Sequence, residues 1–293
     1  MIIHVDNVKK KYKKEWVLKG INMKVEEPNI IALVGPNGSG KTTLLNCMTN
    51  ILKLDEGSIT LLDQPHTDTS IFKEVSYLQD NRILYGHLTA YDHLKFICDV
   101  QKIPYKKIKE VTDRVGMSSY VKRRVQNFSL GMKQHLLLAM AIINQPKILL
   151  MDEPLNGLDP TSAINMREIL LQLYEEGTTI FVSSHNLDEI DRLTHNIHFM
   201  KDGALLKESL KDMDSVTYSI KTNDDDQANL LLKENAFDVQ LQKNRGITFS
   251  ERDVSLQHVM KLLHDHDFTI ISVDNKVEGA EKRYRELFEE GSV

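Results

Sequence analysis

Residues 35–42 constrain the fold of this chain more than any other segment. They read Gly-Pro-Asn-Gly-Ser-Gly-Lys-Thr and fit the pattern G-x-x-x-x-G-K-S/T. The loop follows the apolar run 30–34 and opens a segment, 42–52, that we expect to be helical. A loop in this position wraps phosphate groups with its backbone N–H groups, and the helix N-terminus adds a positive field. The sequence therefore predicts a nucleotide-binding α/β fold.

The loop alone leaves the class of nucleotide-binding protein open. Lys41 is expected to reach phosphate oxygens, and the Thr42 hydroxyl can ligate Mg²⁺. Transport ATPases, kinases and GTPases all cradle phosphates in this way. The rest of the chain must therefore distinguish these classes.

Polar residues follow two more apolar runs, 148–151 and 178–182, which read as buried strands of the same parallel sheet. Because ligands sit at the carboxyl ends of such strands, Asp152, Glu153 and His185 should lie beside the phosphate loop. We expect Asp152 to hold the Mg²⁺ shell and Glu153 to accept a proton from the attacking water. His185 can polarise the same site. Alone, the acid pair would read as a solvated strand end, and the histidine as structural.

Composition limits the partners of the chain. Its 293 residues allow one large and one small domain, and its net charge of -5 gives no global field for nucleic acid or anionic lipid. Cys47 and Cys98 have neither disulfide nor metal spacing, so we expect reduced thiols in a cytosolic protein. The longest apolar stretch is 136–143, shorter than a membrane helix requires. We therefore expect the chain to reach a membrane only by docking.

Periodicity divides the chain at residue 209. Before it, segments 2–8 and 17–25 alternate like antiparallel edge strands, and about 80–145 reads as an inserted helical subdomain. After it, we expect a β-α-β-β-α-β order, which is ferredoxin-like, and then a charged helix. The expected segments are 216–221, 226–234, 237–242, 246–250, 255–264, 268–273 and 278–290. The predicted domains are thus 1–209 and 210–293, and the second carries no motif that we can connect to chemistry.

Residues 128–134, Phe-Ser-Leu-Gly-Met-Lys-Gln, resemble the signature of ABC transporter ATPases, which kinases and GTPases lack. The resemblance covers about 1–208 and includes, in order, Tyr12, loop 35–43, Gln79, 128–134, 148–153, Leu158-Asp159 and His185. It implies a P-loop ABC ATPase core with an antiparallel edge sheet and an inserted helical subdomain, followed by a small α+β domain. It also implies that ATP with Mg²⁺ is bound by Gly35, Asn37, Gly38, Ser39, Gly40, Lys41, Thr42 and Thr43.

The same resemblance implies that two subunits share each nucleotide. Ser129 is a good N-cap for the following helix, which makes a second anion site. In this family, Ser129 and Gly131 would close over the ATP of the opposite subunit, and Asp159 would lie at the dimer seam. Gln79 would contact the γ-phosphate and Mg²⁺ and link them to membrane-facing helices. Tyr12 resembles the residue that stacks on adenine, although such a tyrosine is more often plain packing.

Three departures from the common signature indicate a subtype. Leu130 and Met132 replace glycine and glutamine, and His135 replaces a usual arginine. The variant resembles that of bacterial exporters of bacitracin, lantibiotics and peptides, such as phenol-soluble modulins. The expected protein is then an exporter ATPase, peripheral on the inner face of the cell membrane, that pairs with a like or unlike ATPase subunit and separate permease subunits. An importer ATPase, or a soluble ABC ATPase outside transport, remains an alternative.

The coupling surface is expected within residues 79–96, just after Gln79. Leu84, Tyr85 and Leu88 follow Gln79 closely and can form an exposed apolar groove that grips a permease. The alternative is that these three residues belong to the core.

Overall fold

The computed structural model describes residues 1–209, 215–242, 246–251 and 254–288. It divides the chain into two compact units, Met1–Ser209 and Leu210–Val293. No helix within the described ranges is long and apolar enough to cross a lipid bilayer.

The first unit is built on a six-stranded sheet. Its strand order is β10 (Ala204–Ser209), β9 (Asn196–Lys201), β3 (Ile30–Val34), β8 (Thr179–Ser184), β7 (Ile148–Asp152) and β6 (Val75–Leu78). All neighbours pair in parallel except β10, which is antiparallel to β9. Every residue of β3 and β8 is buried, as expected for continuous apolar runs in a covered parallel sheet. This arrangement brings the carboxyl ends of β3, β8 and β7 side by side.

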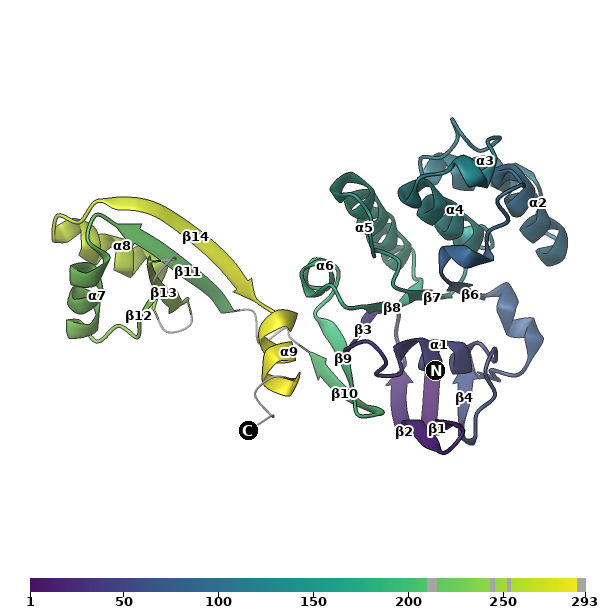
Figure 1. Cartoon of the computed structure of the whole chain (residues 1–293), viewed down its shortest axis with the longest axis horizontal. Helices are drawn as coiled ribbons and strands as arrows, with labels where there is room; N and C mark the ends of the chain where they lie inside the picture. Colours follow the sequence, from purple (N-terminus) through teal and green to yellow (C-terminus); the bar gives the residue numbers. More distant parts are fainter. Residues whose placement is uncertain (210–214, 243–245, 252–253, 289–293) are drawn as a thin grey trace. The chain divides into compact units, whose positions relative to one another are not determined.

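A second, antiparallel sheet faces the first across a shared core. It consists of β2 (Glu15–Val25), β1 (Ile3–Tyr12), β4 (Glu56–Leu61) and β5 (Gln64–Pro65). Helix α1 (Lys41–Met48) lies between the two sheets (Figure 1). Its buried Leu44, Leu45 and Met48 join one apolar cluster with residues of both sheets. The loop that precedes α1 is therefore anchored from two sides.

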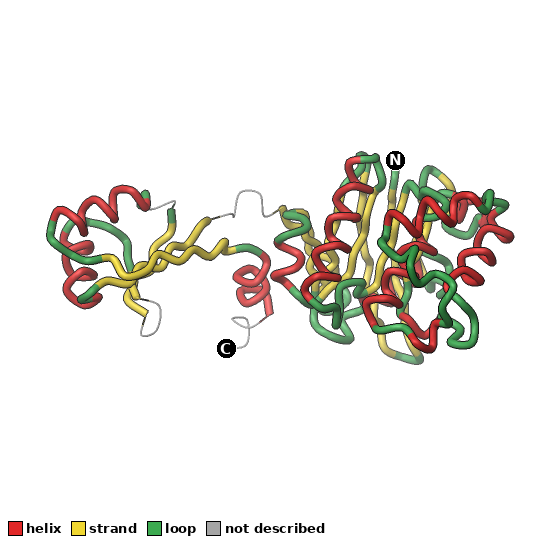
Figure 2. Tube along the Cα trace, turned by 90° about the horizontal axis from the view of Figure 1, so that it is seen from above, coloured by secondary structure: helices red, strands yellow, loops and turns green. Residues whose placement is uncertain are grey.

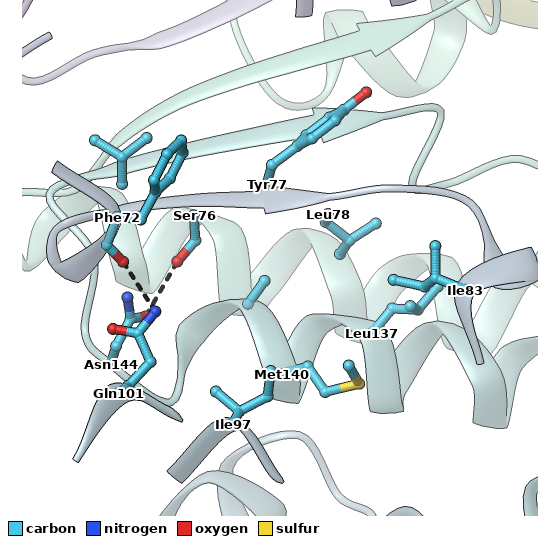
Figure 3. Close-up of a pocket in the computed structure, with 12 residues that line it drawn as sticks. Phe72, Ser76, Tyr77, Leu78, Ile83, Ile97, Gln101, Leu137, Met140 and Asn144 are labelled. Carbon is cyan, nitrogen blue, oxygen red and sulfur yellow. Dashed lines mark hydrogen bonds between the residues drawn. The ribbon is translucent and has the colours of Figure 1, made fainter. Parts of the chain in front are cut away.

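The helical part of this unit contains α2 (Ala90–Gln101), α3 (Lys106–Arg114) and α4 (Leu130–Ile142). Short 3-10 helices connect them to the sheets at η1 (Thr69–Lys73), η2 (Asn81–Ile83) and η3 (Val125–Asn127). Thr89 and Asp92 form a capping box that starts α2. Between β6, α2 and α4 lies a mainly apolar pocket of about 240 Å³, whose lining includes Leu78, Ile97 and Met140 (Figure 3).

Two further helices follow the sheet strands. Helix α5 (Pro160–Glu175) follows β7, and the short α6 (Leu187–Asp191) follows β8. Asp159 caps α5 and proline occupies its first turn, which is a favoured helix start. Figure 2 shows the helices of this unit flanking its strands.

The second unit is a small α+β domain. Its elements are β11 (Ser215–Thr222), α7 (Asp225–Glu234), β12 (Gln240–Gln242), β13 (Gly246–Ser250), α8 (Leu256–Asp265), β14 (Ile270–Glu278) and α9 (Ala280–Phe288). The sheet order is β12-β13-β11-β14, with antiparallel neighbours. Its core joins Ile220 and Ile247 of the sheet to Leu232 of α7 and Val259 of α8. The expected β-α-β-β-α-β order is observed.

Element boundaries differ from the sequence expectation in a few places. Helix α1 ends at Met48 rather than at residue 52, because Thr49 caps it and Asn50 adopts a positive φ of 55°. Strand β14 extends to Glu278 rather than ending at 273. The last two residues of the expected helix 278–290 and the start of the expected domain at 210 lie outside the described residues.

Candidate active site

The phosphate loop has a backbone that requires glycine at two positions. Gly38 and Gly40 have φ of 80° and 107°, in the left-handed region that glycine adopts without strain. A Cβ at residue 40 would also lie only 3.1 Å from Leu18 Cδ2 and 3.2 Å from Val17 Cγ1. Strand β2 therefore packs tightly against the loop where α1 begins.

Lys41 bends back over the loop that precedes it. Its Nζ donates hydrogen bonds to the carbonyl oxygens of Gly35, at 2.7 Å, and Pro36, at 3.3 Å. The side chain is only 7% exposed. Burial lowers the pKa of Lys41, while the negative charges of Glu153 and Asp152 oppose this shift. A compact cation is thus held at the mouth of the loop next to two acids.

A polar group of the loop also lacks a partner. The Ser39 hydroxyl is buried and has no hydrogen-bond partner among the described residues. Leaving such a group unsatisfied costs about 1–3 kcal/mol. An anionic ligand in the loop would provide an acceptor, so the residues present fit a bound polyphosphate.

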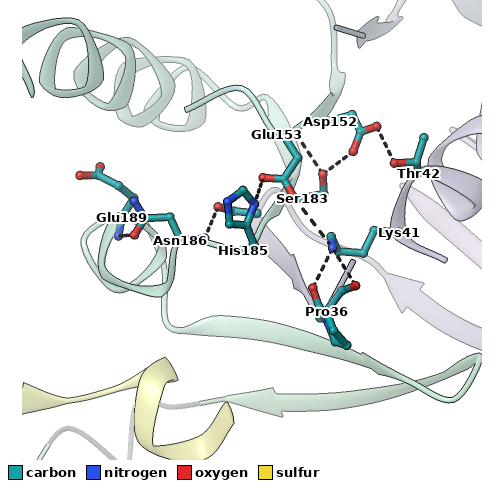
Figure 4. Close-up of polar contacts among 11 residues, drawn as sticks. Pro36, Lys41, Thr42, Asp152, Glu153, Ser183, His185, Asn186 and Glu189 are labelled. Atoms are coloured by element: carbon teal, nitrogen blue, oxygen red, sulfur yellow. Dashed lines mark hydrogen bonds and ion pairs between the residues drawn. The ribbon is translucent and has the colours of Figure 1, made fainter. Parts of the chain in front are cut away.

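Two hydroxyl groups hold the Asp152 carboxylate, one from helix α1 and one from strand β8. Thr42 Oγ1 donates to Asp152 Oδ2 at 2.7 Å, and Ser183 Oγ donates to Asp152 Oδ1 at 2.6 Å (Figure 4). The neighbouring hydroxyl and carboxylate oxygens are the hard ligands that Mg²⁺ prefers. The Thr42–Asp152 pair therefore fits a magnesium ion beside the phosphate loop.

Glu153 sits in a strained backbone conformation just beyond β7. Its φ is 52°, which is uncommon for a residue other than glycine. Its backbone N–H lies within hydrogen-bond distance of two acceptors on Ser183, the hydroxyl at 3.0 Å and the carbonyl at 3.2 Å. Residue 183 thus holds both acids, Asp152 through the carboxylate and Glu153 through the backbone.

The Glu153 carboxylate joins the loop to the end of β8. Its Oε1 lies 3.9 Å from Lys41 Nζ, and its Oε2 lies 2.8 Å from His185 Nδ1 (Figure 4). The Glu153 side chain is 24% exposed and that of His185 is 49% exposed, so both remain accessible. This edge therefore combines a cation, an oxygen site for a metal and an accessible carboxylate, the groups needed to activate water beside a phosphate.

Gln79 and Tyr12 lie outside the bonded network that joins Lys41, Asp152, Glu153 and His185. Leu78 of β6 pairs with Met151 of β7, so Gln79 leaves the sheet next to Asp152. Tyr12 ends β1, pairs with Glu15 across the hairpin and is 45% exposed. The hairpin continues into β2, which contacts the loop at Gly40.

A second polar cluster lies at the start of α4. The Ser129 hydroxyl caps this helix by accepting a hydrogen bond from the Met132 N–H at 3.2 Å. Asp159 caps α5 in the same way and also accepts the Ser162 hydroxyl at 2.7 Å, which lowers the pKa of Asp159. A Cβ on Gly131 would lie 2.8 Å from that hydroxyl oxygen. The starts of α4 and α5 therefore lie together, with the exposed Ser129 and Asp159 beside the buried Gly131.

Two residues that organise these clusters, Ser183 and Ser162, are not among the site residues expected from the sequence. Ser183 holds both acids, and Ser162 joins Asp159 to Gly131. The signal for Ser183 was weak, because it is one of three polar residues in β8, with Thr179 and Ser184. Ser162 stands three residues after Asp159, the spacing at which a helix cap accepts a backbone N–H.

The sequence and the fold of this chain both resemble those of known proteins. Residues 18–156 match the family described as ABC transporter. The lantibiotic transport ATP-binding protein SrtF of Streptococcus pyogenes is 36% identical over 207 residues, 71% of this chain and 90% of SrtF. The bacitracin transport ATP-binding protein BcrA of Enterococcus faecalis is 32% identical over 211 residues, 71% of this chain and 68% of BcrA. The solved structure of cbiO1 from Clostridium perfringens, part of the ABC transporter complex cbiONQ, is similar with a TM-score of 0.64 at 27% identity, over 72% of this chain and 90% of cbiO1.

Proposed function

This chain belongs to the family of ABC transporter ATPases, and from that premise we propose that it hydrolyses ATP to drive peptide export through separate permease subunits. The observation that carries the proposal is the linked set Lys41, Glu153 and His185, with Thr42 and Asp152 beside it. It combines phosphate binding, metal binding and proton acceptance at one sheet edge. An importer ATPase, or an ABC ATPase outside transport, is an outcome of the test below.

Each residue of the set has a proposed role. The loop, with Gly35, Asn37, Gly38, Ser39, Gly40 and Thr43, binds the phosphates, and Lys41 neutralises their charge. Thr42 and Asp152, with Gln79 from the adjacent strand, would hold Mg²⁺, which supplies charge neutralisation at the phosphates when bound. Glu153 accepts the proton of the attacking water, and His185 orients the Glu153 carboxylate and polarises the γ-phosphate. Tyr12 stacks on the adenine.

We assign the second cluster to a partner subunit's nucleotide. Ser129 is exposed and caps α4, so the helix N-terminus and hydroxyl face outward and can bind an anion. Asp159 lies beside this surface, and Ser162 packs between Asp159 and the buried Gly131. Two subunits paired face to face would each close this surface over the ATP of the other, whether the partner is an identical or a related chain.

The substrate class follows from the relatives. SrtF is named for lantibiotic transport and BcrA for bacitracin transport, and each is at least 32% identical to this chain over the aligned residues. We propose a peptide or amphipathic antimicrobial compound as the transported substrate. The chain would then act at the inner face of the cell membrane, held there by its permease. The unit 1–209 would carry the ATPase, and 210–293 would be an accessory domain for regulation or dimerisation.

The permease contact is proposed at the apolar pocket beside Gln79. Figure 3 shows Leu78, Ile83, Leu137 and Met140 around this pocket, which β6, η2 and α4 supply. Ile83 of the lining is 41% exposed. The expected groove residues Leu84, Tyr85 and Leu88 do not line the pocket; Tyr85 is 62% exposed, and Leu84 and Leu88 are half-buried. An apolar segment of a permease can bury these side chains. Because Gln79 directly follows Leu78, closure at the ATP site would move the same surface.

Inside-out vesicles that contain this chain with its co-purified permease test the proposal. Addition of MgATP should drive a labelled lantibiotic-like peptide into the vesicle lumen, which corresponds to export from a cell. The same vesicles with Glu153→Gln should bind nucleotide but accumulate no peptide. Peptide release from preloaded vesicles would indicate an importer, and hydrolysis with no permease in the purified complex would indicate a role outside transport.

A further inference from the structure

His185 depends on its neighbours for its position at the candidate active site. It follows Ser184, the last residue of β8, and its side chain is 49% exposed. Its ring contacts the Glu153 carboxylate, with 2.8 Å between Nδ1 and Oε2. Helix α6, which begins two residues later, spans only Leu187–Asp191. A helix of this length is not stable by itself, so the contacts that anchor α6 also determine where His185 lies.

Two of these anchors are local. The Asn186 side chain caps α6 by accepting the Glu189 N–H at 3.3 Å, and the Asn186 N–H donates to Ser184 Oγ at 3.0 Å (Figure 4). Ile190 is fully buried and fastens one side of the helix to the core. The cap fixes where the helix starts. The direction of the helix also depends on contacts further along.

The third anchor is an ion pair with a second helix. Glu189 Oε2 lies 2.6 Å from Arg167 Nη1 of α5. The two side chains are only 18% and 13% exposed, so solvent screens this pair less than an ion pair on the surface. Met166 and Leu170 of the same helix are fully buried. The pair therefore ties α6 to a helix that is fixed to the core.

Loss of either partner would leave the other charge without compensation. A charged side chain that is mostly buried needs a partner, so the remaining one would turn toward water. The turn that carries His185 would then lose its connection to α5. Asp188, the other acid in the first turn of α6 besides Glu189, offers a comparison. Its side chain is exposed and has no ion pair among the described residues.

We propose that Glu189 is a positioning residue for His185, and that its ion pair with Arg167 holds the imidazole against Glu153. The proposal rests on the ATPase function proposed above. The Glu189 carboxylate does not touch the reacting groups and acts through α6. Because Asp159 caps the start of α5, the ion pair also connects His185 to the helix that begins at the second polar cluster.

Imidazole NMR signals of the full chain, labelled with ¹⁵N-histidine, measure the position of His185 without any hydrolysis. The His185 signals are assigned by their loss in His185→Gln. In the wild type, Glu153→Gln should shift these signals, because it changes the group that faces Nδ1. In Glu189→Ala the signals should shift as well, and they should no longer respond to Glu153→Gln. His66, which follows β5 in the other sheet, is the internal reference.

Two further variants make the NMR test specific to the ion pair. Arg167→Met removes the pair from the side of α5 and should give the same His185 shift, so it tests the proposal even where Glu189→Ala does not fold. Asp188→Asn is the matched control, because it also removes a carboxylate from the first turn of α6 but leaves the ion pair in place. Equal shifts in Asp188→Asn, or unchanged His185 signals in Glu189→Ala or Arg167→Met, would overturn the proposal.

Turnover separates this inference from the proposed function. Glu189→Ala should hydrolyse ATP roughly ten to a hundred times more slowly, because a small misplacement of a catalytic group has an effect of this size. KM for ATP should not change, since the phosphate loop is unaltered. In a His185→Gln background, Glu189→Ala should cause no further loss, and an added loss there would overturn the proposal. Shifted His185 signals with wild-type turnover would support the positioning and contradict the role of His185 in hydrolysis.

Discussion

His185 Nδ1 and Glu153 Oε2 lie 2.8 Å apart, which ties the end of β8 to the acid that follows β7. The other oxygen of the same carboxylate faces Lys41 Nζ at 3.9 Å. When Nδ1 carries the proton and donates to the carboxylate, a neutral ring has a bare Nε2, which can only accept. Only the protonated ring can donate from Nε2 to a phosphate oxygen at the same time. The contact therefore connects the charge state of His185 to its proposed role.

Glu153→Gln tests proton acceptance at this edge. The amide keeps the size of the side chain but cannot take a proton, so we expect ATP hydrolysis to fall by roughly 10²–10⁴. ATP binding should be retained, because the change leaves Lys41 and the phosphate loop in place. Turnover assays and equilibrium nucleotide titration measure the two effects. Turnover near that of the wild type would show that Glu153 is not the proton acceptor.

Ser183→Ala tests a positioning residue. The change removes the hydroxyl that donates to Asp152 and accepts from the Glu153 N–H. We expect turnover to fall roughly tenfold or more and the Mg²⁺ concentration for half-maximal activity to rise, since a hydrogen bond to a charged group contributes about 1.5–3 kcal/mol.

Thr179→Val is the matched control for this prediction. Thr179 lies in the same strand, is fully buried, and its hydroxyl has no partner among the described residues. Its loss should leave turnover and Mg²⁺ dependence unchanged. Equal losses in both variants would mean that Ser183 acts only through strand packing.

Nucleotide-driven pairing is tested at Ser129. Glu153→Gln with saturating MgATP should sediment as a dimer, because ATP remains bound between two subunits. Adding Ser129→Arg should return it to a monomer, since a large side chain would fill the exposed surface at the start of α4. Ile51→Arg, at a 53% exposed position just beyond α1, is the control and should still dimerise. A dimer that survives Ser129→Arg would contradict the shared site.

Coupling to the permease is tested at Tyr85, which is 62% exposed and stands two residues after Ile83 of the apolar pocket. Tyr85→Glu should abolish co-purification with the permease, because a carboxylate would be buried in an apolar interface. Basal ATPase activity and the melting temperature of the isolated chain should not change. Normal assembly would locate the permease contact elsewhere, and unfolding would mean that Tyr85 is part of the core.

His198, which is buried in β9, predicts a specific loss of stability in acid. Burial, assisted by the charge of Lys207, lowers its pKa from 6.5 to about 4. The unfolded chain therefore takes up a proton near pH 6.5 while the folded chain stays neutral until about pH 4. Between these values the wild type should lose about 3 kcal/mol of unfolding free energy relative to His198→Phe. Urea unfolding of both proteins across this range measures the difference, and parallel curves would contradict the shift.

Much of the fold could be predicted because its strands are continuous and apolar. The run at 30–34 is β3 without change of bounds, and the run at 148–151 is β7 with one more residue, Asp152. The fold class is confirmed by the similarity to cbiO1. The end of α1 was less predictable, because the helix cap at Thr49 sets it. The end of β14 was also less predictable, because pairing with β11 extends this strand. Propensity does not encode those tertiary contacts.

Only those residues of the candidate site that belong to sequence motifs could be predicted. Asp152, Glu153 and His185 follow buried strands, so parallel topology alone brings them together. The part played by Ser183 depends on the register that pairs it with Asp152, which periodicity does not specify. The ion pair between Arg167 and Glu189 joins two helices that are separate in the chain, and no local pattern marks it.

The backbone at Glu153 has a wider consequence for how variants of this protein should be judged. A non-glycine residue with φ of 52° stores conformational strain, and glycine at the same position would be relaxed. Glu153→Gly would relieve this strain, but it would also remove the carboxylate that contacts His185. A screen that ranks variants by melting temperature alone would therefore not detect the loss of the reactive group at this residue.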